Sequence, residues 1–227
     1  MAENKKIAAS ENDEFIEKAQ AFWSRYSKQI TIALAVLVIG IGGWYSYRNF
    51  VQKPKAEKAL DVIFKAEEYY RIDSIGKALN GDGINKGFIA VVRDYGGTET
   101  GNLARFYAGD CYLRLGDFAN AAKYLEDFST DSKQVQARAY KLLADAYSEM
   151  GKNDDAISFY KKASNHFTDD SHNSAEYLFF AASLAENAGK ATEAIDLYKQ
   201  VLDKYPTSTS AGEAEKNLAK LGVYNYK

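Results

Sequence analysis

The chain has 227 residues, 29 basic and 31 acidic side chains, and a formal net charge of −2. Both signs are interleaved without a block of either, which excludes the electrostatic footprint of a nucleic-acid-binding protein. A single cysteine excludes an internal disulfide, and there are only two prolines. Ala, Lys, Glu, Tyr and Leu dominate the composition, which predicts an all-α fold.

Residues 1–29 form a polar tail with a patterned second half. Apolar side chains recur at helical spacing after Asn12, a candidate N-cap, and these are Phe15, Ile16, Ala19, Phe22, Trp23 and Tyr26. Because charged residues occupy the other side, we expect an amphipathic helix lying at a membrane interface. The alternative is a tail that is only weakly helical.

Residues 30–48 form the most apolar segment of the chain. About eighteen residues without a charge nearly span a hydrocarbon core of roughly 30 Å. A cleaved signal would have a short basic start and small residues after the apolar stretch, whereas Trp44 and Tyr45 follow here. We therefore expect an uncleaved signal-anchor helix formed by Ile30, Leu34, Leu37, Gly40, Gly43, Trp44 and Tyr47. The alternative is the core helix of a soluble protein, which would need apolar partners on every side.

The orientation of this span is not decided by charge, because Lys and Arg are similarly abundant on both sides and long domains cross largely regardless of charge. Whether the glycines of the span pack against a partner helix is also open.

Residues 102–206 repeat one pattern three times. Six positions recur 35 residues apart, from Ala108, Gly109, Tyr112, Gly116, Ala121 and Leu125 to Leu143, Ala144, Tyr147, Gly151, Ala156 and Tyr160. A third copy follows after 38 residues, with Ala181, Ala182, Ala185, Gly189, Ala194 and Tyr198. Each copy predicts two helices joined by a glycine turn, with small residues where the helices approach closely. The three extra residues fall in the polar stretch HFTDDSHNS, where an insertion costs little.

The flanks of the repeats are also helical. Residues 49–101 predict a membrane-proximal helix from Pro54 to about Arg71 and a degenerate repeat, with a loop at GKALNGDG and then one helical face of Ile84, Phe88, Val91 and Tyr95. Residues 207–227 predict the capping helix that a solenoid requires, with Ala211, Ala214, Leu218 and Leu221 on its inner face.

The repeats resemble the tetratricopeptide repeat, whose unit is about 34 residues, although Arg105 stands where the unit usually opens with a large apolar residue. The expected fold is therefore all-α, with an N-terminal transmembrane helix followed by a tetratricopeptide-repeat α-solenoid and a C-terminal capping helix. Solenoids of this kind bind peptides or protein surfaces in a concave groove.

The repeat geometry places one set of side chains on the concave side, namely Phe106, Asp110, Arg114, Lys141, Asp145, Glu149, Phe179, Ser183 and Glu186. Charges of both signs beside two phenylalanines suit a protein partner. The acidic residues, with Glu176 among them, argue against a basic clamp for a C-terminal carboxylate. The alternative for each residue is that it only solvates the surface.

No pattern points to catalysis, a metal or a cofactor. His166 and His172 lie in or beside one loop with Asp169 and Asp170 between them, but no cysteine or helical spacing supports a metal site there. The chain has no phosphate-binding loop and no G-x-S-x-G motif. Cys111, in an apolar helical stretch, is expected to pack rather than react. We therefore do not expect an enzyme.

The order of the segments is similar to that of the YfgM-type family, single-span repeat proteins associated with the bacterial Sec translocon. The likeness is strongest over residues 13 to about 70, where FWSRY, Gly42, Gly43 and Trp44 occupy the family's places. It implies the bacterial inner membrane, a cytoplasmic N-terminus and a periplasmic repeat domain. The implied partners are Sec channel subunits, a membrane-anchored peptidyl-prolyl isomerase chaperone and exported proteins. The sequence thus predicts a scaffold or co-chaperone at the translocon, with an adaptor for envelope-assembly or cell-division complexes as the alternative.

Overall fold

The computed structural model describes residues 2–224, with side chains from residue 16 onward except that of Ala19. All elements of these residues are helices, so the predicted all-α fold is confirmed. The chain divides into two compact units, one ending at Pro54 and the other beginning at Lys55.

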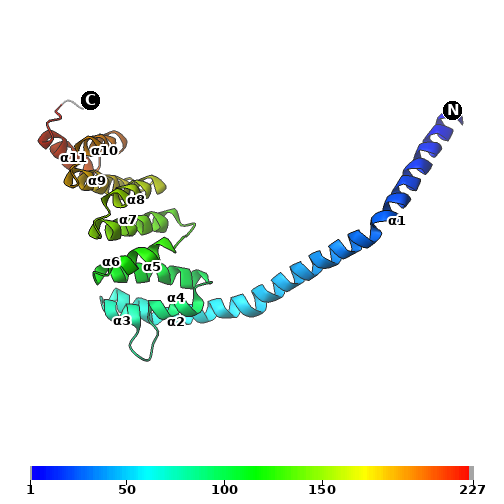
Figure 1. Ribbon diagram of the computed structural model, residues 1–227, viewed down its shortest axis with the longest axis horizontal. Coiled ribbons are helices and arrows are strands. Elements are labelled where there is room, and N and C mark those ends of the chain that lie inside the picture. Colours follow the sequence, from blue (N-terminus) through cyan, green and yellow to red (C-terminus); the bar gives the residue numbers. More distant parts are fainter. Residues whose placement is uncertain (1, 225–227) are drawn as a thin grey trace. The chain divides into compact units, whose positions relative to one another are not determined.

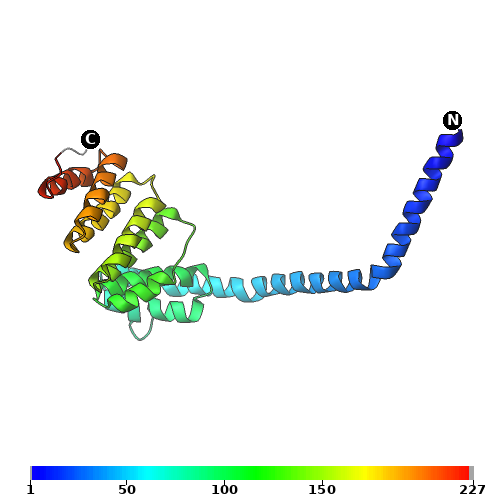
Figure 2. The same ribbon diagram turned by 45° about the horizontal axis from the view of Figure 1, so that its top comes forward.

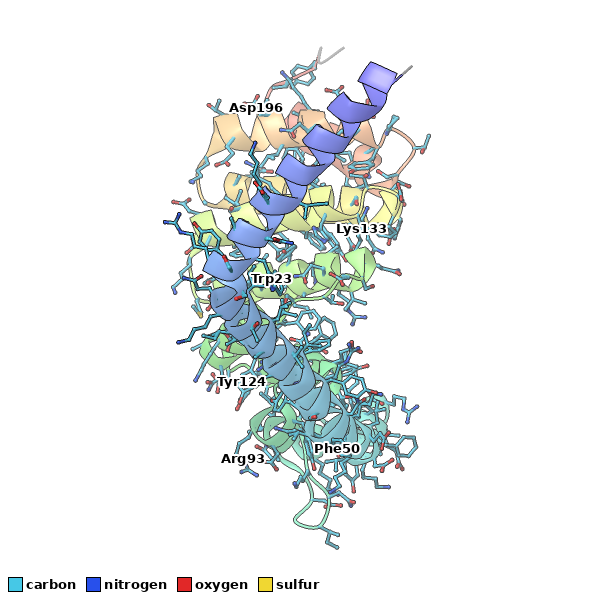
Figure 3. All side chains as sticks on the ribbon, turned by 90° about the vertical axis from the view of Figure 1, so that its right-hand side faces the viewer. Trp23, Phe50, Arg93, Tyr124, Lys133 and Asp196 are labelled. Carbon is cyan, nitrogen blue, oxygen red and sulfur yellow. The ribbon has the colours of Figure 1, made fainter. Side chains whose placement is uncertain are left out.

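The first unit contains α1 (Ala2–Tyr47) and a π-helical turn, η1 (Arg48–Gln52). The prediction that a helix starts after Asn12 is wrong, because Asn12 lies inside α1. The residues before it are largely Ala, Glu and Lys, which favour a helix themselves. The predicted amphipathic positions Phe15 and Ala19 lie outside the described side chains. Trp23 is 58% exposed and projects from the helix (Figure 3).

The apolar part of α1 is open to its surroundings. One helix near the N-terminus is long and apolar enough to cross a membrane, with a mean hydropathy of 1.7 over its most apolar window and none of that window buried. Leu34, Leu37 and Trp44 are each more than half exposed, and a Cβ at Gly40 or Gly43 would meet no other described part of the chain within 4 Å. This exposure does not fit the alternative of a soluble core helix, which would be covered on all sides.

The second unit is a stack of helices that rises from α3 to α11 (Figures 1 and 2). It begins within α2 (Lys53–Arg71), which is followed by α3 (Ile75–Asn80) and α4 (Phe88–Tyr95). Three helix pairs follow: α5 (Glu99–Arg114) with α6 (Phe118–Glu126), α7 (Lys133–Glu149) with α8 (Asn153–His166), and α9 (Ser171–Asn187) with α10 (Ala191–Lys204). α11 (Thr209–Lys220) closes the stack and buries three of the residues predicted for the inner face of a cap, Ala211, Ala214 and Leu218. The fourth, Leu221, follows the helix and is half-buried.

The turn within each pair depends on a glycine. Gly116, Gly151 and Gly189 have φ angles of 79°, 72° and 75°, which strain any residue with a Cβ. The next backbone N–H then reaches back across the end of the helix, as from Asp117 to the Tyr112 carbonyl at 2.9 Å. The predicted glycine stops are confirmed.

Close approach within the first pair depends on Gly109. A Cβ at this position would lie 2.5 Å from Cγ of Leu125 on the paired helix. Ala144 and Ala182 occupy the equivalent positions and are fully buried. The small residues of the repeat therefore set the distance between paired helices.

The segment before the first pair departs from two predictions. GKALNGDG is not only loop, because α3 forms within it and buries Ala78 and Leu79. Ile84 is not on a helical face: it lies in the loop before α4 and is 92% exposed. Asp82 holds this loop by accepting hydrogen bonds from the backbone N–H groups of Ile84 and Asn85, at 2.9 and 2.6 Å. Because these hydrogen bonds stabilise the loop, Ile84 does not have to pack against a helix.

The first helices of successive pairs are not evenly spaced. α5 packs against α7, and α9 packs against α11, whereas α7 and α9 have at most marginal backbone contact. The connection at this step, residues 167–170, is shorter than the one between the first and second pairs, residues 127–132. The rest of HFTDDSHNS lies in α8 and α9, so the stretch is not the loop that the insertion suggested. An open space on the face shared by α7 and α9 follows from this local separation.

Candidate functional site

Two cavities lie between α7 and α9, with volumes of about 410 and 470 Å³. Lys141 lines both, so the two cavities adjoin at this side chain, and we call them together the α7/α9 groove. Its first part is bounded by the N-terminal halves of the two helices and its second part by their C-terminal halves, with Leu113 and Phe118 of the first pair closing one side. Two adjoining open cavities along a pair of helices suit a polypeptide better than a compact small molecule.

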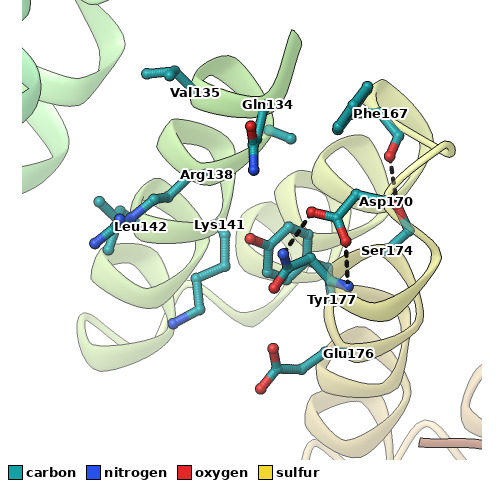
Figure 4. Close-up of a pocket in the computed structure, with 12 residues that line it drawn as sticks. Gln134, Val135, Arg138, Lys141, Leu142, Phe167, Asp170, Ser174, Glu176 and Tyr177 are labelled. Carbon is teal, nitrogen blue, oxygen red and sulfur yellow. Dashed lines mark hydrogen bonds between the residues drawn. The ribbon is translucent and has the colours of Figure 1, made fainter. Parts of the chain in front are cut away.

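The first part of the groove has walls of opposite charge (Figure 4). α7 contributes Arg138 and Lys141, while Asp170 and Glu176 come from the N-terminal turn and the body of α9. The Tyr177 ring is buried between the walls, and burial followed by the charge of Glu176 raises the pKa of its phenol. This part of the groove is therefore lined by charged, polar and apolar side chains together.

Only some of these charges are already neutralised. Asp170 caps α9, accepting hydrogen bonds from the backbone N–H and the side-chain Nδ2 of Asn173, at 3.2 and 2.6 Å. Arg138 is exposed and stacks over Phe106 at 5.8 Å, and it makes no ion pair with the described side chains. Glu176 is half-buried and likewise has no hydrogen bond or ion pair with a described group. Arg138 and Glu176 therefore line the groove without an ion pair among the described side chains, and the Arg138 guanidinium lies over Phe106 of α5.

The second part of the groove is built on a shared carboxylate. Asp145 accepts a hydrogen bond from the Tyr160 hydroxyl at 2.6 Å and pairs with Nζ of Lys141 at 2.8 Å. Burial, then Asp145, raises the pKa of Tyr160, which stays protonated and donating. Nζ of Lys141 also lies 5.6 Å from the Phe180 ring centre. This network fixes the position of the Lys141 charge at the junction of the two cavities.

The structure brings together four of the projected groove residues, namely Lys141, Asp145, Glu149 and Ser183. Phe179 is half-buried with its ring 5.6 Å from Tyr198, and Glu186 accepts a hydrogen bond from the Tyr198 hydroxyl at 2.7 Å. These two side chains do not line the groove.

The three projected residues of α5 likewise bond or pack against other parts of the protein instead of lining the groove. Phe106 and Asp110 are both 6% exposed. Phe106 packs on Phe128, and Asp110 accepts the Tyr70 hydroxyl. Arg114 forms an ion pair with Asp73. None of the three lines either cavity. Asp110 and Arg114 are bonded to the segment before the first pair, whereas Phe106 is covered by Phe128 and Arg138.

Glu176, already counted among the acidic residues of the concave side, lines the groove, but sequence reasoning missed Arg138, Phe180 and Asn187, which line it too. The repeat offset could have found Arg138, which lies 38 residues before Glu176 at the equivalent position of the second copy. Asn187 is the equivalent of Glu149, so the projection onto Glu186 was displaced by one residue.

The histidines and the cysteine have structural surroundings. The His166 ring meets the Tyr140 ring edge-on at 5.3 Å, and His172 is exposed. No group of three or more His, Cys, Asp or Glu side chains with a geometry for metal binding occurs within the described part of the chain. Cys111 is fully buried, and this burial raises its thiol pKa to about 12. It therefore remains a protonated core residue at neutral pH.

Comparison of the sequence with protein-family patterns gives one match. The pattern of the tetratricopeptide repeat-like domain covers residues 20–221. The chain belongs to the tetratricopeptide repeat-like family. The match begins before the apolar stretch of α1 and ends just after α11, so the apolar stretch is part of the matched region in this tetratricopeptide repeat-like protein. No curated protein matches the chain in sequence.

Proposed function

We propose that this tetratricopeptide repeat-like protein is a membrane-anchored scaffold that holds a protein partner in the α7/α9 groove. The observation that carries the proposal is the groove itself, two adjoining cavities lined by charged, polar and aromatic side chains. Domains of this family generally bind proteins rather than catalyse reactions. The exposed apolar helix supplies the anchor.

The more specific proposal is an ancillary subunit of the bacterial Sec translocon of the YfgM type. It is supported by the resemblance carried by FWSRY, Gly42, Gly43 and Trp44. In this arrangement residues 1–29 are cytoplasmic, residues 30–48 cross the inner membrane and the repeats lie in the periplasm. The partners would be Sec channel subunits and a membrane-anchored peptidyl-prolyl isomerase chaperone, with exported chains in the groove.

Photocrosslinking in intact membranes tests both levels of this proposal. A photoreactive residue replaces Glu149, which is exposed and lines the groove, and in a second variant it replaces Trp44 of the anchor. The matched control replaces Asp203, which is exposed on α10 and lines neither cavity. Captured proteins are identified by mass spectrometry.

The expected result is capture of a defined protein from position 149 and of channel subunits from position 44, with neither from position 203. Equal capture from positions 149 and 203 would contradict a partner in the groove. Capture of envelope-assembly or division proteins alone would overturn the translocon assignment in favour of the adaptor.

A further inference from the structure

The two free charges of the α7/α9 groove define a chemistry for its occupant. Arg138 and Glu176 stand on opposite walls of the first cavity and neither is neutralised by a described neighbour (Figure 4). The other two charges of this cavity are committed, Asp170 to capping α9 and Lys141 to Asp145. The groove therefore presents one positive and one negative wall rather than a field of one sign.

We propose that the groove selects an extended peptide of mixed charge, with an acidic and a basic residue flanking an apolar one. This inference rests on the proposed protein-binding function and names the class of segment that is bound. The acidic residue would pair with the Arg138 guanidinium and the basic residue with the Glu176 carboxylate. The apolar residue would lie over the Tyr177 floor between them.

Charge complementarity excludes the other peptide classes. A uniformly acidic segment would place like charge beside Glu176, and a uniformly basic one would place it beside Arg138. A bound peptide that left the Arg138 or Glu176 charge unpaired would also remove water from that charge without replacing the lost interactions. Two walls of opposite charge therefore weaken the binding of both uniformly acidic and uniformly basic peptides. They also fix the direction in which a mixed-charge peptide lies.

The separation of α7 and α9 leaves the space in which a peptide would bind. Neighbouring first helices pack on each other on both sides of this step, at α5 with α7 and at α9 with α11. Arg138 and Glu176 occupy equivalent positions of their repeats, yet no ion pair joins them.

The test uses the full chain in detergent micelles and three synthetic peptides labelled with fluorescein. The peptides share a central apolar residue and carry acidic residues only, basic residues only, or one sign on each side. Fluorescence anisotropy should show that the wild type binds the mixed-charge peptide about tenfold more tightly than either of the others.

Single charge reversals should change this order in opposite directions. Arg138→Glu makes both walls acidic and should transfer the preference to the basic peptide. Glu176→Arg makes both walls basic and should transfer it to the acidic peptide. Arg138 and Glu176 make no structural ion pair, so the variants should fold, which circular dichroism checks.

The matched controls are Lys123→Glu and Glu215→Lys, which reverse exposed charges on α6 and α11 away from the groove. They should leave the order unchanged. Equal binding of the three peptides by the wild type, or no binding of any, would overturn the mixed-charge proposal. So would a change of order in the controls, since net charge would then explain it. Capture of a partner from position 149 would in each case leave the proposed scaffold function standing.

Discussion

The two ends of the solenoid are held together differently. In the second and third pairs, a tyrosine on the second helix bonds to an acid on the first helix of the same pair, as Tyr160 does with Asp145 and Tyr198 with Glu186. In the first pair, Leu125 stands in place of that tyrosine. The acid, Asp110, instead receives the hydroxyl of Tyr70 from α2, which lies 40 residues earlier in the chain.

The difference shows that the first pair is not an independent unit. Phe88 of α4 stacks on Tyr107 of α5 with ring centres 4.9 Å apart, and Arg105 donates to the Gly96 carbonyl at 2.9 Å. Arg105, an unusual residue for the opening of the repeat, thus has a partner in the preceding segment. The later pairs contain their own polar bonds, whereas the first pair requires α2–α4.

The strongest way to break this dependence is to remove Phe88. Its side chain is fully buried, so Phe88→Ala should lower the free energy of unfolding by about 3–5 kcal/mol. Hydrogen exchange should show the loss concentrated in α2–α6, with α7–α11 still protected. Phe64→Ala, which truncates a phenylalanine that is 59% exposed on α2, is the control and should have little effect. Equal loss of protection along the whole stack would contradict the separation of the two ends.

The tyrosine bonds sharpen the comparison. Tyr70→Phe leaves the buried Asp110 carboxylate without its hydrogen-bond donor and should cost about 2 kcal/mol. Tyr160→Phe should cost only about 1 kcal/mol, because Asp145 keeps its ion pair with Lys141 at 2.8 Å. Urea unfolding of the two variants measures both values. The reverse order would show that the polar bond between segments is not the more important one.

Alkaline pH should lower the stability of the later pairs. Burial, then the bond to Glu186, raises the pKa of Tyr198 to about 12, whereas an unfolded tyrosine titrates near about 10. The protonated phenol therefore stabilises the fold fully below about pH 10, and this contribution declines as the pH rises through about 12. Tyr198→Phe should lose stability less steeply over that range than the wild type, measured by urea unfolding at successive pH values. Tyr224→Phe, at an exposed position, should follow the wild type.

The smallest expected effect is a gain in the free energy of unfolding from a substitution within the later pairs. Ser164 of α8 is fully buried and its hydroxyl has no hydrogen-bond partner among the described atoms. Ser164→Ala should therefore raise the free energy of unfolding by about 1 kcal/mol. Ser174→Ala is the matched comparison: its hydroxyl donates to the Phe167 carbonyl at 3.0 Å, so the same change should destabilise. Destabilisation by both would indicate that packing of the serine, not its polarity, matters.

Much of the helical framework could be predicted because it depends on local rules. Turn glycines need a positive φ, as at Gly116 and Gly151, and small residues recur where paired helices touch, as at Gly109. The groove was only partly predictable, since a projected position is not necessarily accessible. Phe106 lies on the projected face but packs on Phe128. Its neighbours in space come from other helices, which a single repeat does not reveal.

The sequence by itself determined the order of segments: an apolar helix, three glycine-turned helix pairs and a cap. Periodicity and length suffice for this, because each element satisfies its backbone bonds within itself. Only the tertiary structure decided which charges remain free. Arg138 and Glu176 line the groove between α7 and α9 without an ion pair to a described side chain. In the first pair, by contrast, Asp110 accepts a hydrogen bond from Tyr70 and Arg114 forms an ion pair with Asp73. The reason is physical: the state of a charge depends on partners distant in the chain, and their distances are set by packing.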